Sequence, residues 1–89
     1  MGMKRSEVEP GFYYEKKEVP GRLRLVLYIR GGGATYAEST GDGHIGRHLT
    51  LQRWASRRLS AEEAEKEFPD EVAKIAAVLA KARVFEYLP

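Results

Sequence analysis

The sequence predicts an α+β fold in which a four-stranded antiparallel meander, curled into a partly open barrel, is followed by two or three C-terminal helices. Three observations lead to this fold class. Short alternating runs separated by glycine-rich turns fill residues 10–49, and helical spacing begins near residue 50. The charge also changes sign: residues 1–59 carry 11 Lys and Arg against 6 Asp and Glu, whereas residues 60–89 carry 4 against 7.

The composition places the chain among small soluble domains. Its 89 residues, 43% hydrophobic and 31% charged, suit one domain with a small core. The absence of a long apolar run and of a signal-like start predicts a cytoplasmic protein. The absence of cysteine excludes disulfides and thiolate chemistry. With no Asn, one Gln, 11 Glu and 9 Arg, the sequence also has a thermophile-like composition.

The first elements are expected to be a flexible leader and an edge strand. Residues 1–9 are polar and predict a leader, so the single domain is expected to span residues 10–89. Residues 12–18 begin with aromatic residues and end with charged ones, which suits an edge strand. Pro20 and Gly21 then suit the central positions of a type II turn, because proline fixes φ and glycine tolerates a positive φ.

Residues 23–29 form the clearest predicted strand. Leu23, Leu25, Leu27 and Ile29 occupy every second position, so a regular strand places them on one face. The opposite face is then basic and aromatic; it carries Arg22, Arg24, Val26, Tyr28 and Arg30.

Two further strands complete the predicted meander. Gly31–Gly33 ends the preceding strand, and residues 34–39 form the third strand. Residues 40–43 form the next turn, which is followed by a fourth strand over residues 44–49. Residues 50–59 are then expected to form a short helix. In that helix Leu51, Trp54, Ala55 and Arg58 have i, i+3, i+4, i+7 spacing, and Thr50 can act as N-cap.

The remaining residues, 60–89, predict an acidic helical tail. Ser60 and Glu63 have the spacing of a capping box, which starts a helix that runs to about Glu67. Pro69 suits the first turn of a last helix. The stripe of this last helix comprises Val72, Ile75, Ala76, Leu79 and Ala82, and Phe85, Tyr87 and Leu88 are expected to dock the C-terminus onto the body.

The order of these segments resembles small SH3-like barrel proteins of phage and mobile elements, whose function is unknown. The matching residues lie within 10–56 only: Pro10-Gly11-Phe12-Tyr13-Tyr14, Leu23–Ile29, Ala34-Thr35-Tyr36 and Leu51-Gln52-Arg53-Trp54. The tail from Ser60 has no counterpart in that pattern. The resemblance therefore implies a fold and no particular activity.

The basic-aromatic residues give the main functional hypothesis, which is nucleic-acid binding. Arginine and lysine neutralise phosphates, aromatic rings stack on bases, and small barrels often bind nucleic acid on such a sheet face. Lys16 and Lys17 could lie near this face. The other reading is a solvated outer face, or a docking site for the acidic helices. The candidate DNA- or RNA-binding residues are Arg22, Arg24, Tyr28, Arg30, Arg47, Arg53, Arg57 and Arg58.

Other chemistry is poorly supported. His44 and His48 with Asp42 form the only metal-like group, but on a strand the two imidazoles are about 13 Å apart, so no metal site is expected. Ser39 with His44 and Asp42 lacks a nucleophile elbow. Gly31–Gly33 lacks the Lys-Ser/Thr of a phosphate-binding loop and suits a hairpin turn better. We therefore expect no enzyme and no cofactor.

A second hypothesis is a protein-interaction or oligomerisation module built on the helical tail. The last helix has apolar residues on more than one side, and its small alanines permit close helix approach, which predicts a homodimer contact. These alanines are Ala73, Ala76, Ala77 and Ala80.

Overall fold

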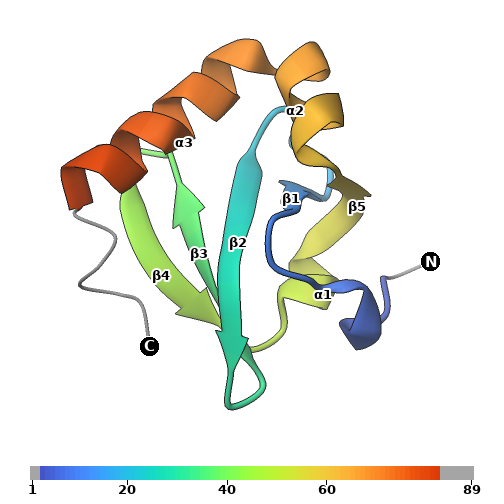
Figure 1. Ribbon diagram of the computed structural model, residues 1–89. Helices are drawn as coiled ribbons and strands as arrows, with labels where there is room; N and C mark the ends of the chain where they lie inside the picture. Colours follow the sequence, from blue (N-terminus) through green and yellow to red (C-terminus); the bar gives the residue numbers. More distant parts are fainter. Residues whose placement is uncertain (1–2, 83–89) are drawn as a thin grey trace.

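The computed structural model describes residues 3–82 and confirms an α+β fold (Figure 1). Within these residues lie a five-stranded antiparallel sheet, three α-helices and one 3-10 turn. In chain order they are η1 (Arg5–Glu7), β1 (Tyr13–Lys16), β2 (Leu23–Arg30), β3 (Gly33–Glu38), β4 (His44–His48), α1 (Leu51–Trp54), β5 (Ala55–Leu59), α2 (Ala61–Glu67) and α3 (Pro69–Ala82).

The sheet is open and does not close into a barrel. Its strand order is β4-β3-β2-β1-β5, so the first four strands follow one another as a meander and the fifth returns to pair with β1. β1 is therefore an inner strand and not the edge strand expected for residues 12–18. Gly21, in the turn between β1 and β2, has φ +83°, which agrees with the glycine position expected for that turn.

The fifth strand occupies residues for which the sequence predicts a helix. The helix expected over 50–59 ends at Trp54, where the backbone N–H of Ala55 bonds to the carbonyl of Leu51. Residues 55–59 then extend and pair with β1. The physical reason is that Tyr14 of β1 is fully buried, and buried backbone groups need hydrogen-bond partners on both sides of the strand. The predicted N-cap, Thr50, makes no capping hydrogen bond through its side chain.

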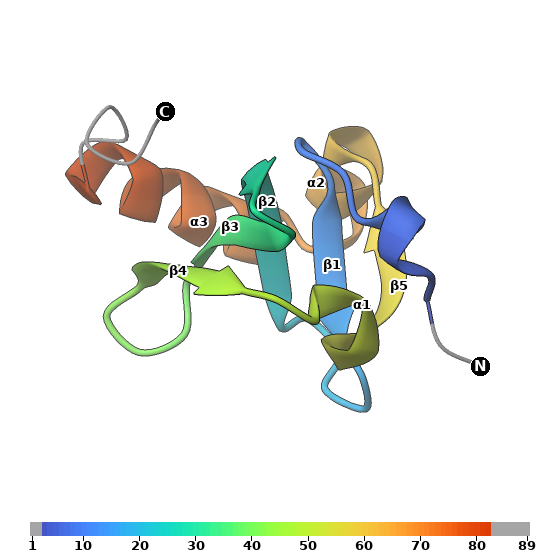
Figure 2. The same cartoon turned by 90° about the horizontal axis from the view of Figure 1, so that it is seen from below.

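Both faces of the sheet are packed. On one face, α2 and α3 contribute Ala64 and Ile75 to a cluster with Leu23, Ala37 and Leu59. Figure 2 shows α1 on the opposite side of the sheet from α2 and α3. The inner cluster on that side consists of Val8, Tyr14, Val26, Ala34, Leu51 and Ala55.

The N-terminal segment packs against the body from residue 3 onward, which differs from the leader expected for residues 1–9. Arg5–Glu7 forms the 3-10 turn, and Val8 is buried in the inner cluster. The Tyr14 hydroxyl donates to the Glu7 carbonyl and accepts from the Glu9 N–H, both at 2.7 Å. These two bonds anchor the turn to β1.

The helical tail begins as the sequence predicts. The Ser60 Oγ accepts from the Glu63 N–H, and the Glu63 carboxylate accepts from the Ser60 N–H, which confirms the capping box. In α3, Ile75 is buried, whereas Ala76 and the other predicted alanines are exposed. The homodimer contact through this helix stays a prediction, and the docking expected for Phe85, Tyr87 and Leu88 lies outside the described residues.

Candidate functional site

A β-bulge in β2 changes the predicted strand faces. Two residues directly opposite each other on neighbouring strands point to the same face of the sheet, so the register shows which way each side chain points. Val26 lies opposite Tyr36 of β3, and Tyr28 lies opposite Thr35, which is adjacent to Tyr36. Two steps along β2 therefore match one step along β3, because the register shifts between Val26 and Tyr28. Leu27 is therefore an extra residue in β2, and every later side chain of the strand changes face.

This bulge divides the basic-aromatic face on which the nucleic-acid hypothesis rests. Arg22 and Arg24, before the bulge, lie on the side of the inner cluster. Tyr28 and Arg30, after it, lie on the side of the sheet that α2 and α3 pack against, and Ile29 moves to the side of the inner cluster. The sequence predicts one shared face for these residues, which holds only for a regular strand. The bulge interrupts the alternation, so the residues lie on two different faces.

Arg24 is buried and acts inside the molecule. Its guanidinium carbon lies 4.1 Å from the ring centre of Tyr36 and 4.2 Å from that of Trp54, so it is sandwiched between two aromatic rings. Its Nε donates to the carboxylate of Glu38 at 2.5 Å, and Glu38 is 1% exposed. Arg22 bonds the second oxygen of Glu38 at 3.1 Å. These two arginines therefore balance a buried carboxylate rather than a phosphate.

The electrostatics of this inner cluster follow from burial and pairing. Burial alone would raise the pKa of Glu38, but hydrogen bonds from Arg24 and Thr40 and the charges of the two arginines hold it below its usual value. The Nδ1 of His48 lies 2.9 Å from Nη1 of Arg24, so Nδ1 acts as the acceptor and the imidazole is neutral. Burial, and then the charge of Arg24, lower the pKa of His48.

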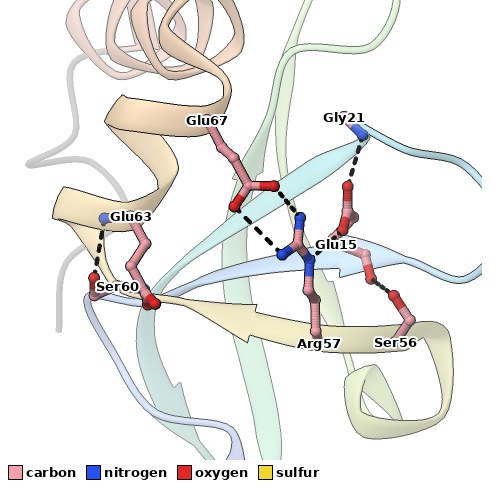
Figure 3. A network of polar contacts seen from close by, with 7 residues as sticks. All are labelled: Glu15, Gly21, Ser56, Arg57, Ser60, Glu63 and Glu67. Atoms are coloured by element: carbon pink, nitrogen blue, oxygen red, sulfur yellow. Dashed lines mark hydrogen bonds and ion pairs between the residues drawn. The ribbon is translucent and has the colours of Figure 1, made fainter.

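Arg57 and Arg58 on β5 are also held by protein groups. Arg57 bonds Glu15 on β1 at 2.6 Å and Glu67 on α2 at 2.6 Å, which ties the sheet to the helical tail (Figure 3). Both carboxylates raise the pKa of Arg57. Arg58 donates to the Glu7 carbonyl, and its guanidinium lies over the ring of Phe12. The charge asymmetry of the chain is thus partly satisfied internally.

Three of the predicted residues do come together, at the turn between β2 and β3. Tyr28 and Arg47 both lie opposite Thr35, one on each side, so they share its face. The guanidinium carbon of Arg30 lies 5.6 Å from the ring centre of Tyr28. Arg47 donates to the carbonyl of Arg30 at 2.9 Å and to that of Gly31 at 3.2 Å.

Arg5 approaches the same turn from the other side of the sheet. Its Nη2 donates to the Gly32 carbonyl at 3.0 Å. Sequence reasoning missed this residue because it lies in the segment assigned to the leader, and no local signal connects it to a turn 27 positions away. We call the group formed by Arg5, Tyr28, Arg30 and Arg47 around Gly31–Gly33 the arginine tip.

The glycines of this turn allow the two guanidinium groups to lie close to its backbone. A Cβ on Gly32, which has φ +77°, would lie 2.3 Å from Arg5 Nη2. A Cβ on Gly33 would lie 2.7 Å from Arg47 Nε. The run of glycines therefore serves both the hairpin and the packing of two arginines against its backbone.

The arginine tip differs from the other basic residues in its electrostatic balance. Within residues 3–82, carboxylate partners lie within ion-pair distance of Arg22, Arg24, Arg57 and Arg58, and of none of the tip arginines. Arg53, the remaining predicted residue, is exposed on α1, and no hydrogen bond or ion pair of the described chain joins it to the tip.

The residues considered for metal binding or catalysis do not form a site. Among the described residues, no three His, Cys, Asp or Glu side chains are placed to hold a metal ion. The Ser39 hydroxyl donates to Glu71 of α3 at 2.7 Å, and His44 packs edge-on against the ring of Tyr36. Ser39, His44 and Asp42 therefore show no hydrogen-bonded arrangement of a nucleophile and a base.

Comparison of the chain with protein-family models, with curated proteins and with solved structures finds no match. Along residues 3–82, none of the helices is both long enough and apolar enough to cross a membrane.

Proposed function

We propose that this protein is a small non-enzymatic module that binds single-stranded nucleic acid through the arginine tip. The observation that carries the proposal is the gathering of three exposed guanidinium groups around one turn, with no carboxylate paired to them in the described chain. An arginine that bonds only backbone carbonyls keeps its full positive charge and several free N–H donors. Such groups bind phosphate oxygens through charge-assisted hydrogen bonds.

The shape of the tip favours a flexible strand over a duplex. The three arginines lie on both sides of a narrow hairpin, so a ligand must bend around the turn to reach them. Tyr28 is half-buried beside Arg30, and an aromatic ring next to a guanidinium is suited to stack on an unpaired base. The glycines add no side chains that would keep a phosphate backbone away.

The proposal extends to the fold. We infer that the open sheet is a variant of the SH3-like arrangement of phage and mobile-element proteins that residues 10–56 resemble. In support, β1 to β4 form a meander, and β5 returns to β1 after one helical turn. Small barrels and partly open barrels frequently present sheet edges and loops to oligonucleotides.

The test is binding of labelled single-stranded and double-stranded DNA and RNA at 50 mM and 200 mM salt. If three phosphates are neutralised, the logarithm of the binding constant falls with that of salt concentration with a slope of about −2 for single strands. Affinity then drops about 20-fold between the two salt concentrations. This slope is shallower than the full predicted set would give, because four of its arginines already have carboxylate partners.

The variant to compare is Arg30→Gln with Arg47→Gln, and the matched control is Lys66→Gln with Lys81→Gln. Both pairs remove two exposed positive charges, from the tip in the first case and from α2 and α3 in the second. We expect at least a tenfold loss of affinity for the tip variant and less than a twofold loss for the control. Equal losses would mean nonspecific attraction, and no binding at 50 mM salt would refute the proposal.

A further inference from the structure

An apolar groove lies beside the arginine tip, on the inner side of the sheet. It has a volume of about 440 Å³ and runs between the 3-10 turn η1, the end of the β2–β3 hairpin and the link from β4 to α1. Its floor is formed by Val8, Ala34 and Leu51, which belong to the inner cluster. Ile29 and Leu49 stand at its sides.

The two side residues are unusually exposed for their size. Ile29 is 44% and Leu49 is 57% exposed, and the remaining exposed large hydrophobic residue of the described chain, Val19, lies elsewhere in the β1–β2 turn at 40%. Ile29 reaches this position because of the bulge at Leu27, which turns it away from the leucines of the same strand. A regular strand would have left the groove without this wall.

The charge of the groove indicates what it can hold. Arg5 and His48 line it, and its lining contains no Asp or Glu. His48 is neutral, since its Nδ1 accepts from Arg24, so Arg5 supplies the charge. Arg5 uses one N–H on the Gly32 carbonyl and is held in place there with donors left over. An occupant that combines apolar side chains with a carboxylate complements both features of this lining.

The groove does not suit the ligand proposed for the tip. Its lining is mostly aliphatic and contains no Phe, Tyr or Trp, and its one ring, that of His48, is held by Arg24, so it is poorly suited to stacking on bases. Its volume is in the range of pockets that hold small ligands or a few side chains. A short extended peptide fills such a space with one or two anchoring side chains.

We propose that this groove is a docking site for an acidic segment of another protein. The segment presents a large aliphatic or aromatic side chain between Ile29 and Leu49, and an Asp or Glu one or two residues away bonds the guanidinium of Arg5. This site shares Arg5 with the arginine tip but does not involve Arg30 or Arg47, so the two proposals can be tested by different variants.

The experiment is selection of a phage-displayed library of nine-residue peptides on the full chain, followed by affinity measurement of the enriched peptides by fluorescence polarisation. We expect enrichment of an apolar residue with a nearby Asp or Glu. Ile29→Asp with Leu49→Asp should abolish binding, and Val19→Asp, at an exposed apolar residue outside the groove, should change affinity less than twofold. All three positions are exposed, so these variants are expected to fold.

Two further measurements complete the test. Replacing the peptide carboxylate by its amide should weaken binding to the native protein about tenfold but leave binding to Arg5→Gln nearly unchanged, as for a charge pair at an interface. When an enriched peptide is titrated into the native protein, the NMR chemical-shift changes should centre on the amides of Gly32, Leu49 and Gln52. This measurement needs no variant.

Four outcomes would overturn this inference: no enriched peptide, enrichment of basic peptides, binding that survives Ile29→Asp with Leu49→Asp, or an affinity unaffected by the carboxylate. Self-association that these two substitutions disrupt would also overturn it, because the occupant would then be a second copy of the chain. None of these results affects the nucleic-acid proposal, which the Arg30 and Arg47 variant tests separately.

Discussion

The ion pair between Glu38 and Arg24 can be tested by Glu38→Gln, which keeps the shape of the side chain and removes its charge. Arg24 is then left between two aromatic rings with its side chain 11% exposed and no counter-charge. Breaking a buried pair from one side destabilises a protein by about 3–5 kcal/mol. The amide can still accept one hydrogen bond, and Arg22 is a third exposed, so we expect about 3 kcal/mol, at the lower end of that range.

Urea and thermal unfolding, followed by circular dichroism, measure this loss. For a domain of this size, 3 kcal/mol corresponds to a fall in Tm of about 12–24 °C. Glu62→Gln, an exposed carboxylate on α2, is the matched control and should change stability by less than about 0.5 kcal/mol. A loss below about 1 kcal/mol for Glu38→Gln would refute the reasoning, because Arg24 would then be solvated without its partner.

The pH dependence of stability provides a second measure of the same pair. The pKa of Glu38 is lower in the folded protein than its usual 4.5, so the unfolded chain binds the proton first as the pH falls. The stabilisation by Glu38 is therefore complete above about pH 4.5 and is lost below it as the pH approaches the folded pKa. Glu38→Gln should be less stable at pH 7 and should lose less stability on acidification than the native protein.

Two other predictions concern the rest of the molecule. Burial and the charge of Arg24 lower the pKa of His48 from 6.5, so the unfolded chain is protonated first as the pH falls. The free energy of unfolding should therefore decline as the pH falls below 6.5. His48→Gln should flatten this part of the profile measured by urea unfolding, and an unchanged slope would contradict the assignment. Gly43→Ala should destabilise the fold more than Gly41→Ala. Both glycines have a positive φ, but only a Cβ on Gly43 would lie 2.3 Å from Val78 of α3. Equal losses of stability in urea unfolding would indicate that α3 moves away without cost.

The regular elements could be predicted because each has a local signal. The alternation of Leu23 and Leu25, the turn at Gly21 and the capping box at Ser60 depend on neighbours within a few residues, and the structure confirms each of them. The order of the first four strands also follows from their short connections. The α+β class was therefore accessible from sequence.

The errors arise where distant contacts override a local pattern. The spacing of Leu51, Trp54 and Ala55 fits a helix, but the unpaired side of β1 requires a partner and draws residues 55–59 into the sheet. The bulge at Leu27 leaves no trace in the sequence, because every residue from Leu25 to Ile29 is apolar or aromatic and nothing marks one of them as extra.

The candidate site was predicted only in part for a related reason. An arginine in a sequence indicates charge but not its partner, and the carboxylates of Glu38, Glu15 and Glu67 that hold Arg24 and Arg57 lie 10 to 42 positions away from them. In the arginine tip, Arg5 and Arg47 likewise lie 25 and 17 positions away from Arg30. Sequence patterns can therefore identify the basic residues, but they cannot separate those that stabilise the fold from those left free for a ligand.

The sandwich around Arg24 also gives the chain a built-in spectroscopic reporter. Trp54 is the sole tryptophan, and Lys16, Arg22 and Arg24 all lie within 6 Å of its ring. Positive charges beside an indole shift its emission, so the emission wavelength of Trp54 in the native protein should depend on these three cations. Rearrangement of the inner ion pair can thus be followed by intrinsic fluorescence, without a label and separately from the backbone signal of unfolding.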